Sequence, residues 1–182
     1  MTTVSTQINA DKVKVININD TAEELINLSI NEARPKISRY DQDKDIAILL
    51  QDKVFTDQFH YILTENIAKE FSRNDTSIEA VYLFDPDANP GLESGDYLPI
   101  DPCLHLLLVV EKASAGLNAY LAAFNRAITE VINKMPSPIY SGIHSFMDVI
   151  LITNQDIESR KGYAALISSI FSPPLRVWAK NR

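Results

Sequence analysis

The stretch from Ile78 to Val110 contains two apolar runs, IEAVYLF at residues 78–84 and LHLLLVV at residues 104–110, joined by a long polar loop. Short apolar runs rich in β-branched, aromatic and leucine side chains predict neighbouring buried strands. The loop between them, residues 85–102, is longer than most connections in a compact domain, and such loops are often functional. We therefore predict that this stretch forms the centre of a sheet with an exposed loop at one end.

Helical periodicity flanks the two runs. Apolar residues recur at three- and four-residue steps through residues 46–71, where a break near Asp52 divides the stretch into two predicted helices. After the second run, Ser114 is a good N-cap for an amphipathic helix at residues 117–132. Each predicted strand therefore has a long helix next to it in the sequence.

A third apolar run, residues 146–152, carries a single carboxylate, Asp148. The capping-box spacing of residues 153–156 predicts a helix directly after this run, and residues 175–182 form a short charged tail that we expect to be solvated. Strands that alternate with long helices predict an α/β (α+β) fold, a mixed β-sheet covered by helices.

Residues 1–42 are predicted to be an N-terminal extension of a domain formed by residues 43–182, all in one compact unit. The extension begins without structural signals, continues with a short strand at residues 12–19, and contains a helix that starts at the capping box of residues 21–24. Pro35 ends that helix, because the proline ring clashes with the preceding turn.

The composition excludes several classes of protein. The 182 residues carry a formal net charge of −7, whereas nucleic-acid binders present a basic face, so no bulk nucleic-acid binding is expected. No apolar run approaches the roughly 20 residues needed to cross a bilayer, and residues 1–10 lack the apolar centre of a signal peptide. We therefore expect a cytoplasmic chain with no membrane association. The single cysteine, Cys103, excludes an intramolecular disulfide.

The order of these elements, and the residues on three of them, resemble the nucleotidyltransferase superfamily of DNA polymerase beta and the minimal nucleotidyltransferases. In that family a strand ending Leu-Phe-Gly-Ser is followed by a loop, a strand of the type Ser-Asp-x-Asp-Leu-Leu-Val, a helix, and a third strand with a third carboxylate. Residues 80–84 are similar to the first strand, residues 105–110 to the second and residues 147–151 to the third, with Asp148 at the third carboxylate position. The resemblance covers residues 45–172 and implies a nucleotidyltransferase-like fold.

The departures from that family pattern concern its chemistry. Asp85 and Pro86 replace the Gly-Ser that lets the backbone approach nucleotide phosphates, and Cys103 and His105 occupy the two positions of Asp-x-Asp. Neither a thiol nor an imidazole is the hard oxygen ligand that Mg²⁺ prefers. The resemblance therefore implies a degenerate, non-catalytic member that acts as a binding or regulatory module for a protein partner or a small ligand, neither of which the sequence identifies.

Two other hypotheses remain open at this point. One is a metal-dependent nucleotidyltransferase with a displaced carboxylate set, in which Asp101 and Asp148 hold Mg²⁺ with help from Asp96. Magnesium is expected only under this hypothesis, and no other cofactor follows from the sequence. The other is a structural protein-interaction domain that forms a homo-oligomer through the N-terminal elements.

The loop is also a weak candidate for a metal site of its own. Asp85, Asp87 and Asn89 have the alternating oxygen spacing of a calcium loop, with Asp96 at the position of the closing ligand. The flanking elements are strands, whereas a calcium loop of this type lies between helices, and Pro90 stands where the sharp turn needs glycine. A solvated acidic loop shaped by prolines and a glycine is the alternative interpretation.

His105 has two conceivable partners. If the second and third strands are neighbours, His105 pairs with Asp148. Cys103 and His105 also share a strand face, but their backbones would be about 7 Å apart, too far for the direct hydrogen bond of a nucleophile and its base. The candidate catalytic residues are therefore Asp101, His105 and Asp148.

Overall fold

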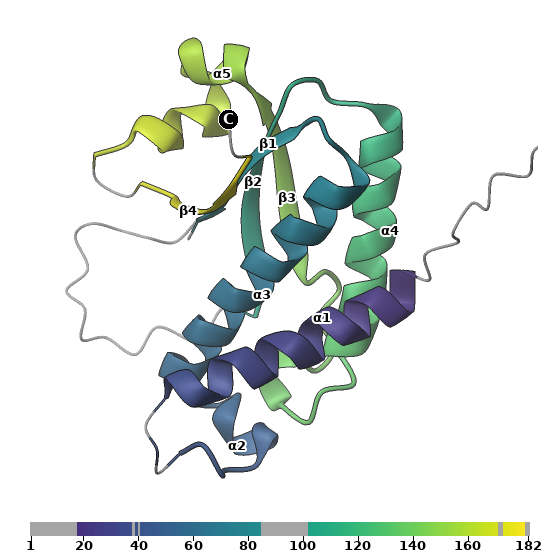
Figure 1. Ribbon diagram of the computed structural model, residues 1–182, viewed down its shortest axis with the longest axis vertical. Coiled ribbons are helices and arrows are strands. Elements are labelled where there is room, and N and C mark those ends of the chain that lie inside the picture. The colour runs from purple at the N-terminus through teal and green to yellow at the C-terminus, as the bar shows by residue number, and fades with distance from the viewer. Residues whose placement is uncertain (1–17, 38, 40, 85–101, 171–172, 181–182) are drawn as a thin grey trace, which may run out of the picture.

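The computed structural model describes residues 18–37, 39, 41–84, 102–170 and 173–180. These residues form a mixed α+β fold in which helices cover a four-stranded sheet (Figure 1). The predicted fold class, a mixed sheet covered by helices, is confirmed.

The sheet has the strand order β3-β2-β1-β4. Its strands are β1 (Ile78–Phe84), β2 (Leu104–Val110), β3 (Met147–Thr153) and β4 (Leu175–Ala179). β1 is antiparallel to both β2 and β4, whereas β2 and β3 are parallel. A parallel neighbour needs a crossover connection, and the helix between β2 and β3 supplies it. The three predicted strands are confirmed, with β3 shifted by one residue.

Three long helices pack on one face of the sheet: α1 (Ile18–Ala33), α3 (Lys53–Asn74) and α4 (Ala115–Ile132). Their apolar stripes bury Ile26, Phe59 and Phe124 in one core with the strand residues Val81 and Leu106. α1 shares this core because it packs against both α3 and α4. Residues 18–33 are therefore a structural part of the same compact unit as the sheet.

A smaller cluster covers the second face of the sheet. There α5 (Asn154–Glu158) and the 3₁₀ helix η3 (Gly162–Ser168) pack Ile157 and Ala164 against Leu107, Val109 and Ile152. Because side chains alternate along a strand, residues 105 and 148 belong to this second face. The second face therefore carries the polar pair that the sequence singled out.

The local signals for helix starts act as predicted. The Asp52 carboxylate accepts a hydrogen bond from the Phe55 N–H at 2.9 Å and so caps the N-terminus of α3. Asp52 therefore marks the break between α3 and the short helix α2 (Ile46–Leu49). Ser114 caps α4 in the same way. Thr153 and Asp156 form a reciprocal capping box at the start of α5. The predicted break near Asp52 is confirmed.

Other expectations were wrong. The last two residues of the strand predicted at residues 12–19 are helical, because α1 begins at Ile18. Residues 12–17 lie outside the described residues. The capping box of residues 21–24 is consequently inside α1. The helix after Thr153 is short, because Arg160 adopts a left-handed conformation (φ 50°) that ends it before η3.

The charged tail is also different from its prediction. Residues 175–179 form β4, which extends the sheet beside β1, and the Lys180 N–H donates to the Glu79 carbonyl at 2.8 Å. Two short 3₁₀ helices, η1 (Arg34–Lys36) and η2 (Pro138–Tyr140), complete the described elements. Among the described residues, none of the helices combines the length and the apolar character needed to cross a bilayer.

Tyr140 provides a test of this core at high pH. Its ring is fully buried, its hydroxyl is 2.9 Å from Nε2 of His60, and burial raises the pKa of Tyr140 above its usual range. The unfolded state therefore loses this proton first, so the contribution of Tyr140 to stability is present below about pH 10 and is lost as the pH rises further. We expect Tyr140→Phe to flatten the alkaline decline in the free energy of unfolding, measured by urea titration at pH 8 and pH 10.5.

The variant also removes the hydrogen bond between Tyr140 and His60, so we expect a stability cost of about 1 kcal/mol at pH 8. Tyr163→Phe, at a half-exposed ring, is the matched control and should leave the alkaline decline unchanged. An alkaline decline that is equally steep in Tyr140→Phe and the wild type would contradict the prediction.

Candidate functional site

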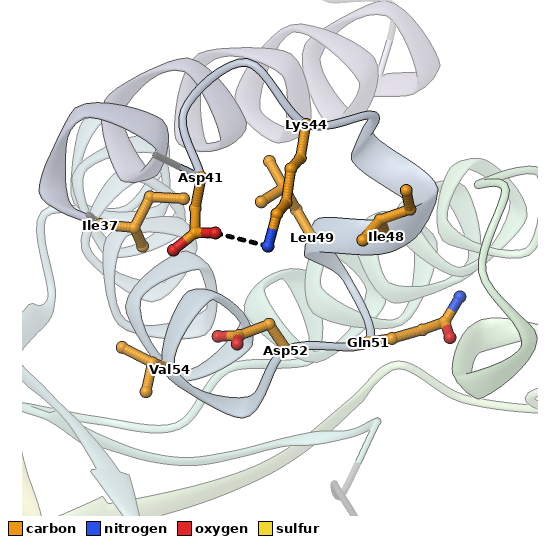
Figure 2. A pocket seen from close by; sticks show the side chains of 8 residues that line it. All are labelled: Ile37, Asp41, Lys44, Ile48, Leu49, Gln51, Asp52 and Val54. Carbon is orange, nitrogen blue, oxygen red and sulfur yellow. Dashed lines mark ion pairs between the residues drawn. The ribbon is translucent and has the colours of Figure 1, made fainter. Parts of the chain in front are cut away.

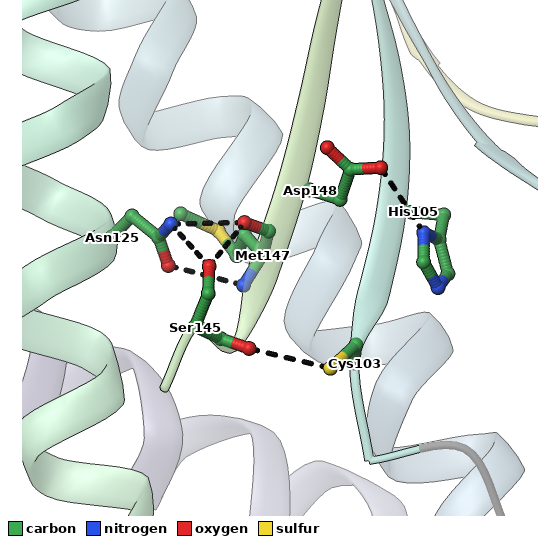
Figure 3. Close-up of polar contacts among 6 residues, drawn as sticks. All are labelled: Cys103, His105, Asn125, Ser145, Met147 and Asp148. Atoms are coloured by element: carbon green, nitrogen blue, oxygen red, sulfur yellow. Dashed lines mark hydrogen bonds and ion pairs between the residues drawn. The ribbon is translucent and has the colours of Figure 1, made fainter. Parts of the chain in front are cut away.

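His105 and Asp148 lie side by side on neighbouring strands. The parallel register of β2 and β3 places the two residues opposite each other. Nδ1 of His105 is 3.4 Å from Oδ2 of Asp148 (Figure 3). The His105 side chain is 18% exposed and that of Asp148 is 61% exposed, so the carboxylate is the solvent-facing member. The predicted pairing of His105 with Asp148 is confirmed.

The His105 ring contacts the ring of Phe84, which in turn contacts the ring of Tyr163. The centroid of the Phe84 ring lies 5.6 Å from the His105 ring and 5.9 Å from the Tyr163 ring of η3. His105 therefore contacts the aromatic ring of Phe84 and the carboxylate of Asp148. A carboxylate beside Nδ1 orients an imidazole ring.

Cys103 lies directly before β2 and contacts a different segment. Its thiol donates to the carbonyl oxygen of Ser145 at 3.3 Å (Figure 3). The residue is half-buried. This hydrogen bond joins the residue before β2 to the segment that precedes β3.

A hydrogen-bonding network lies beside the pair and was not predicted from the sequence. The Asn125 side chain of α4 accepts from the Met147 N–H at 3.0 Å and donates to the Met147 carbonyl at 2.9 Å. The same amide group donates to Oγ of Ser145 at 2.8 Å (Figure 3). Asn125 therefore fixes the first residue of β3, the neighbour of Asp148. The available signal was a polar residue adjacent to the apolar stripe of α4, and that pattern does not identify its partner.

The other candidate ligands cannot be placed beside Asp148. Asp85, Asp87, Asp96 and Asp101 all lie outside the described residues. Within the described part of the chain, no group of three or more His, Cys, Asp or Glu side chains is arranged to hold a metal ion. The described site therefore offers one carboxylate and one imidazole in contact with each other.

A separate cavity of about 470 Å³ lies between α2, the start of α3 and the segment that follows η1. Figure 2 shows Asp41 and Lys44 joined by an ion pair across this cavity, with Asp52 beside them. The hydrogen bond to Asp41 and the charge of that carboxylate raise the pKa of Lys44. The rim carries Ile48 and Val54, which are 56% and 64% exposed. This mixture of aliphatic surface and paired charge suits binding.

Comparison with known proteins found no matching family model, no matching curated protein and no matching solved structure.

Proposed function

We propose that the chain is a nucleotidyltransferase-like domain without transfer chemistry that acts as a binding or regulatory module. The observation that carries this proposal is the pairing of Asp148 with His105 at 3.4 Å. At that place on neighbouring strands, the family pattern has carboxylates that share Mg²⁺. An imidazole there replaces a metal ligand with a group that satisfies the carboxylate directly.

The chemistry of Mg²⁺ supports this proposal. Magnesium takes hard oxygen ligands in an octahedral arrangement, and transfer from a nucleoside triphosphate needs metal ions that bridge the carboxylates and the phosphates. On β2 and its entry, the aligned positions are Cys103 and His105, whose sulfur and nitrogen atoms are poor ligands for this ion. Asp148 alone is insufficient to hold a metal ion in place during transfer.

The arrangement of the elements also supports a nucleotidyltransferase-like domain. β1 and β2 are antiparallel neighbours, and α4 then crosses to β3 beside β2. This is the order that the resemblance implies, and it places the two strands with the polar pair at the centre and edge of the sheet. The proposed ligand surface is the second face of the sheet around His105.

One observation favours the displaced-carboxylate alternative. The Asp148 carboxylate is 61% exposed, so it is accessible to a metal ion and to ligands from another segment. Under this alternative, Asp101 would supply the second carboxylate, and metal and nucleotide would bind together. The two hypotheses therefore differ in whether Mg²⁺ strengthens nucleotide binding.

Thermal unfolding with ATP, GTP and CTP, each with and without Mg²⁺, tests the proposal. We expect no rise in melting temperature that requires both nucleotide and metal, and no difference between the wild type and Asp148→Asn in this respect. A ligand at 100 times its dissociation constant adds about 2.7 kcal/mol, which raises the melting temperature of a domain of this size by several degrees. Binding of this strength is therefore easily detected.

The outcomes separate the alternatives. A rise that needs both components and disappears in Asp148→Asn would overturn the proposal in favour of the transferase. A rise with nucleotide alone, unchanged by a chelator, would support a binding module for nucleotides. Ser159→Ala, on the exposed part of the chain after α5, is a control for nonspecific effects of substitution.

A further inference from the structure

β3 forms one edge of the sheet, because β2 is its only neighbour in the strand order β3-β2-β1-β4. The pairing with β2 runs without a register shift from Met147 to Thr153. β3 therefore presents a regular outer side, in contrast to β1, whose pairings with β2 and β4 both contain an irregularity.

Hydrogen bonds at the start of β3 show which of its backbone groups face outwards. The Phe146 carbonyl accepts from the Leu104 N–H at 2.8 Å, so residue 146 points towards β2. The N–H and carbonyl of Met147 instead bond to Asn125 of α4, away from β2. Because the direction alternates along a strand, the N–H and carbonyl groups of Val149 and Leu151 also face outwards.

Side chains of the same chain form hydrogen bonds with the outward backbone groups at both ends of β3, and we call the outward N–H and carbonyl groups of β3 the outer row. Asn125 bonds to the N–H and the carbonyl of Met147, and the Ser145 hydroxyl donates to the same carbonyl at 2.9 Å. At the other end, the Asp156 carboxylate accepts from the Thr153 N–H at 2.9 Å. Between these two closures, the outward N–H and carbonyl groups of Val149 and Leu151 have no hydrogen-bond partner within the described part of the chain. Two donors and two acceptors are thus left in a row of fixed length.

We propose that this open edge binds the same edge of a second copy of the chain. Two β3 strands that run antiparallel across a two-fold axis at Ile150 place Val149 of each copy opposite Leu151 of the other. Each such pair exchanges two N–H···O bonds, so the four outward groups of one copy are satisfied by the four of the other. The row is self-complementary because its two residues lie symmetrically about Ile150.

The side chains fit the same arrangement. Val149 meets Leu151 on one face and Ile150 meets the second Ile150 on the other, and apolar cross-strand pairs stabilise an antiparallel ladder. Asp148, the single charged residue of β3, lies opposite Ile152 of the other copy, so no like charges are opposed. A partner strand with charged residues opposite Val149, Ile150 and Leu151 would lose these apolar contacts, whereas the same edge of a second copy supplies an apolar residue at all three positions. We therefore assign the edge to a second copy.

The opposite edge of the sheet has features that discourage such pairing. β4 is preceded by Pro173 and Pro174, contains Arg176, and is followed by Lys180. Prolines, charges and irregular pairing are the usual means by which edge strands avoid association. Between Met147 and Thr153, β3 has no proline and no register shift, and its single charged residue is Asp148. The inference is independent of the proposed function, because neither nucleotide nor metal enters it.

Measurement of the mass of the full chain by sedimentation equilibrium, from micromolar to near-millimolar concentration, tests the proposal. We expect the mass to rise from that of a 20.4 kDa monomer towards twice that value. The net charge of −7 opposes association, so added salt should strengthen it. A mass that stays monomeric at every concentration and salt level would overturn the proposal.

Amide hydrogen exchange in the same samples locates the contact. The amides of Val149 and Leu151 should exchange severalfold more slowly at high than at low concentration, because they become hydrogen-bonded only in the dimer. The amides of Ile150 and Ile152 bond to β2 in either state and serve as internal controls. Association without slower exchange at the first two amides would place the contact elsewhere and overturn the proposal.

Val149→Pro is the matched variant. It removes an N–H that the monomer does not use for its sheet, and proline is tolerated at outward positions of edge strands. We expect a folded monomer at all concentrations, whereas Val149→Ile, which keeps the N–H, should associate like the wild type. Ile150→Glu, which would oppose two carboxylates on the axis, provides a second test if the proline variant does not fold. A folded Ile150→Glu or Val149→Pro variant that still dimerises would overturn the proposal.

Discussion

Phe124→Ala is expected to lower the free energy of unfolding by about 3–5 kcal/mol, because it empties a fully buried position at the junction of two long helices. The Phe124 ring of α4 lies 5.1 Å from the Phe71 ring of α3 and 6.1 Å from the Tyr120 ring. Its edge-to-face contact with Phe71 joins the two helices above the sheet. Alanine would leave a cavity that this packed helix pair cannot fill.

Urea unfolding monitored by circular dichroism measures the effect. Phe124→Leu keeps most of the volume and should cost much less than the alanine variant. Arg126→Ala, on the exposed side of the same helix, should change stability by no more than about 0.5 kcal/mol. A loss below about 1 kcal/mol in Phe124→Ala would mean that α4 does not pack on α3 as described.

The features that sequence analysis predicted well are those that short-range patterns determine. The three- and four-residue spacing of apolar residues in α3 and α4 reflects burial of one helix face, and it located both helices. Asp52 and Ser114 cap helices through hydrogen bonds that span three residues of the chain. Both the periodicity and the caps are encoded within one or two helical turns.

The features that were missed depend on distant segments. Residues 175–179 contain only two large apolar side chains beyond Leu175, and they form a strand because β1, far away in sequence, offers a free edge. The end of α5 depends on the left-handed conformation of Arg160, and arginine, unlike glycine, gives no sequence signal for such a conformation. Local composition does not specify either outcome.

The candidate site shows the same division. The His105–Asp148 pair was predictable because two parallel strands in register bring residues at corresponding positions together. The contacts of Asn125 were not predictable, because they depend on how far α4 lies from the edge of β3. The acidic loop between β1 and β2, which holds most of the predicted metal ligands, lies outside the described residues.

Asn125→Ala is expected to destabilise the fold by about 1–3 kcal/mol and to strengthen self-association. The substitution leaves the N–H of buried Met147 without its partner, and an unsatisfied buried group costs about 1–3 kcal/mol. The Met147 carbonyl loses Asn125 but keeps the Ser145 hydroxyl at 2.9 Å. Alanine's higher helix propensity offsets roughly 0.5 kcal/mol of this loss. Asn118→Ala, at an exposed position of the same helix, is the control and should not destabilise the fold.

The effect on association follows from the length of the open row. With Asn125 removed, the Met147 N–H is released, and the Met147 carbonyl, which keeps the Ser145 hydroxyl, has a second lone pair for a new donor. These groups join those of Val149 and Leu151, so an antiparallel partner centred on Val149 can form three pairs in place of two. We therefore expect sedimentation equilibrium to show a lower dissociation constant for the variant, together with its lower melting temperature. A loss of stability with an unchanged dissociation constant would confirm the Asn125 contact and count against pairing through β3. A variant as stable as the wild type would show that Asn125 does not hold the start of β3, and that the edge is not closed there.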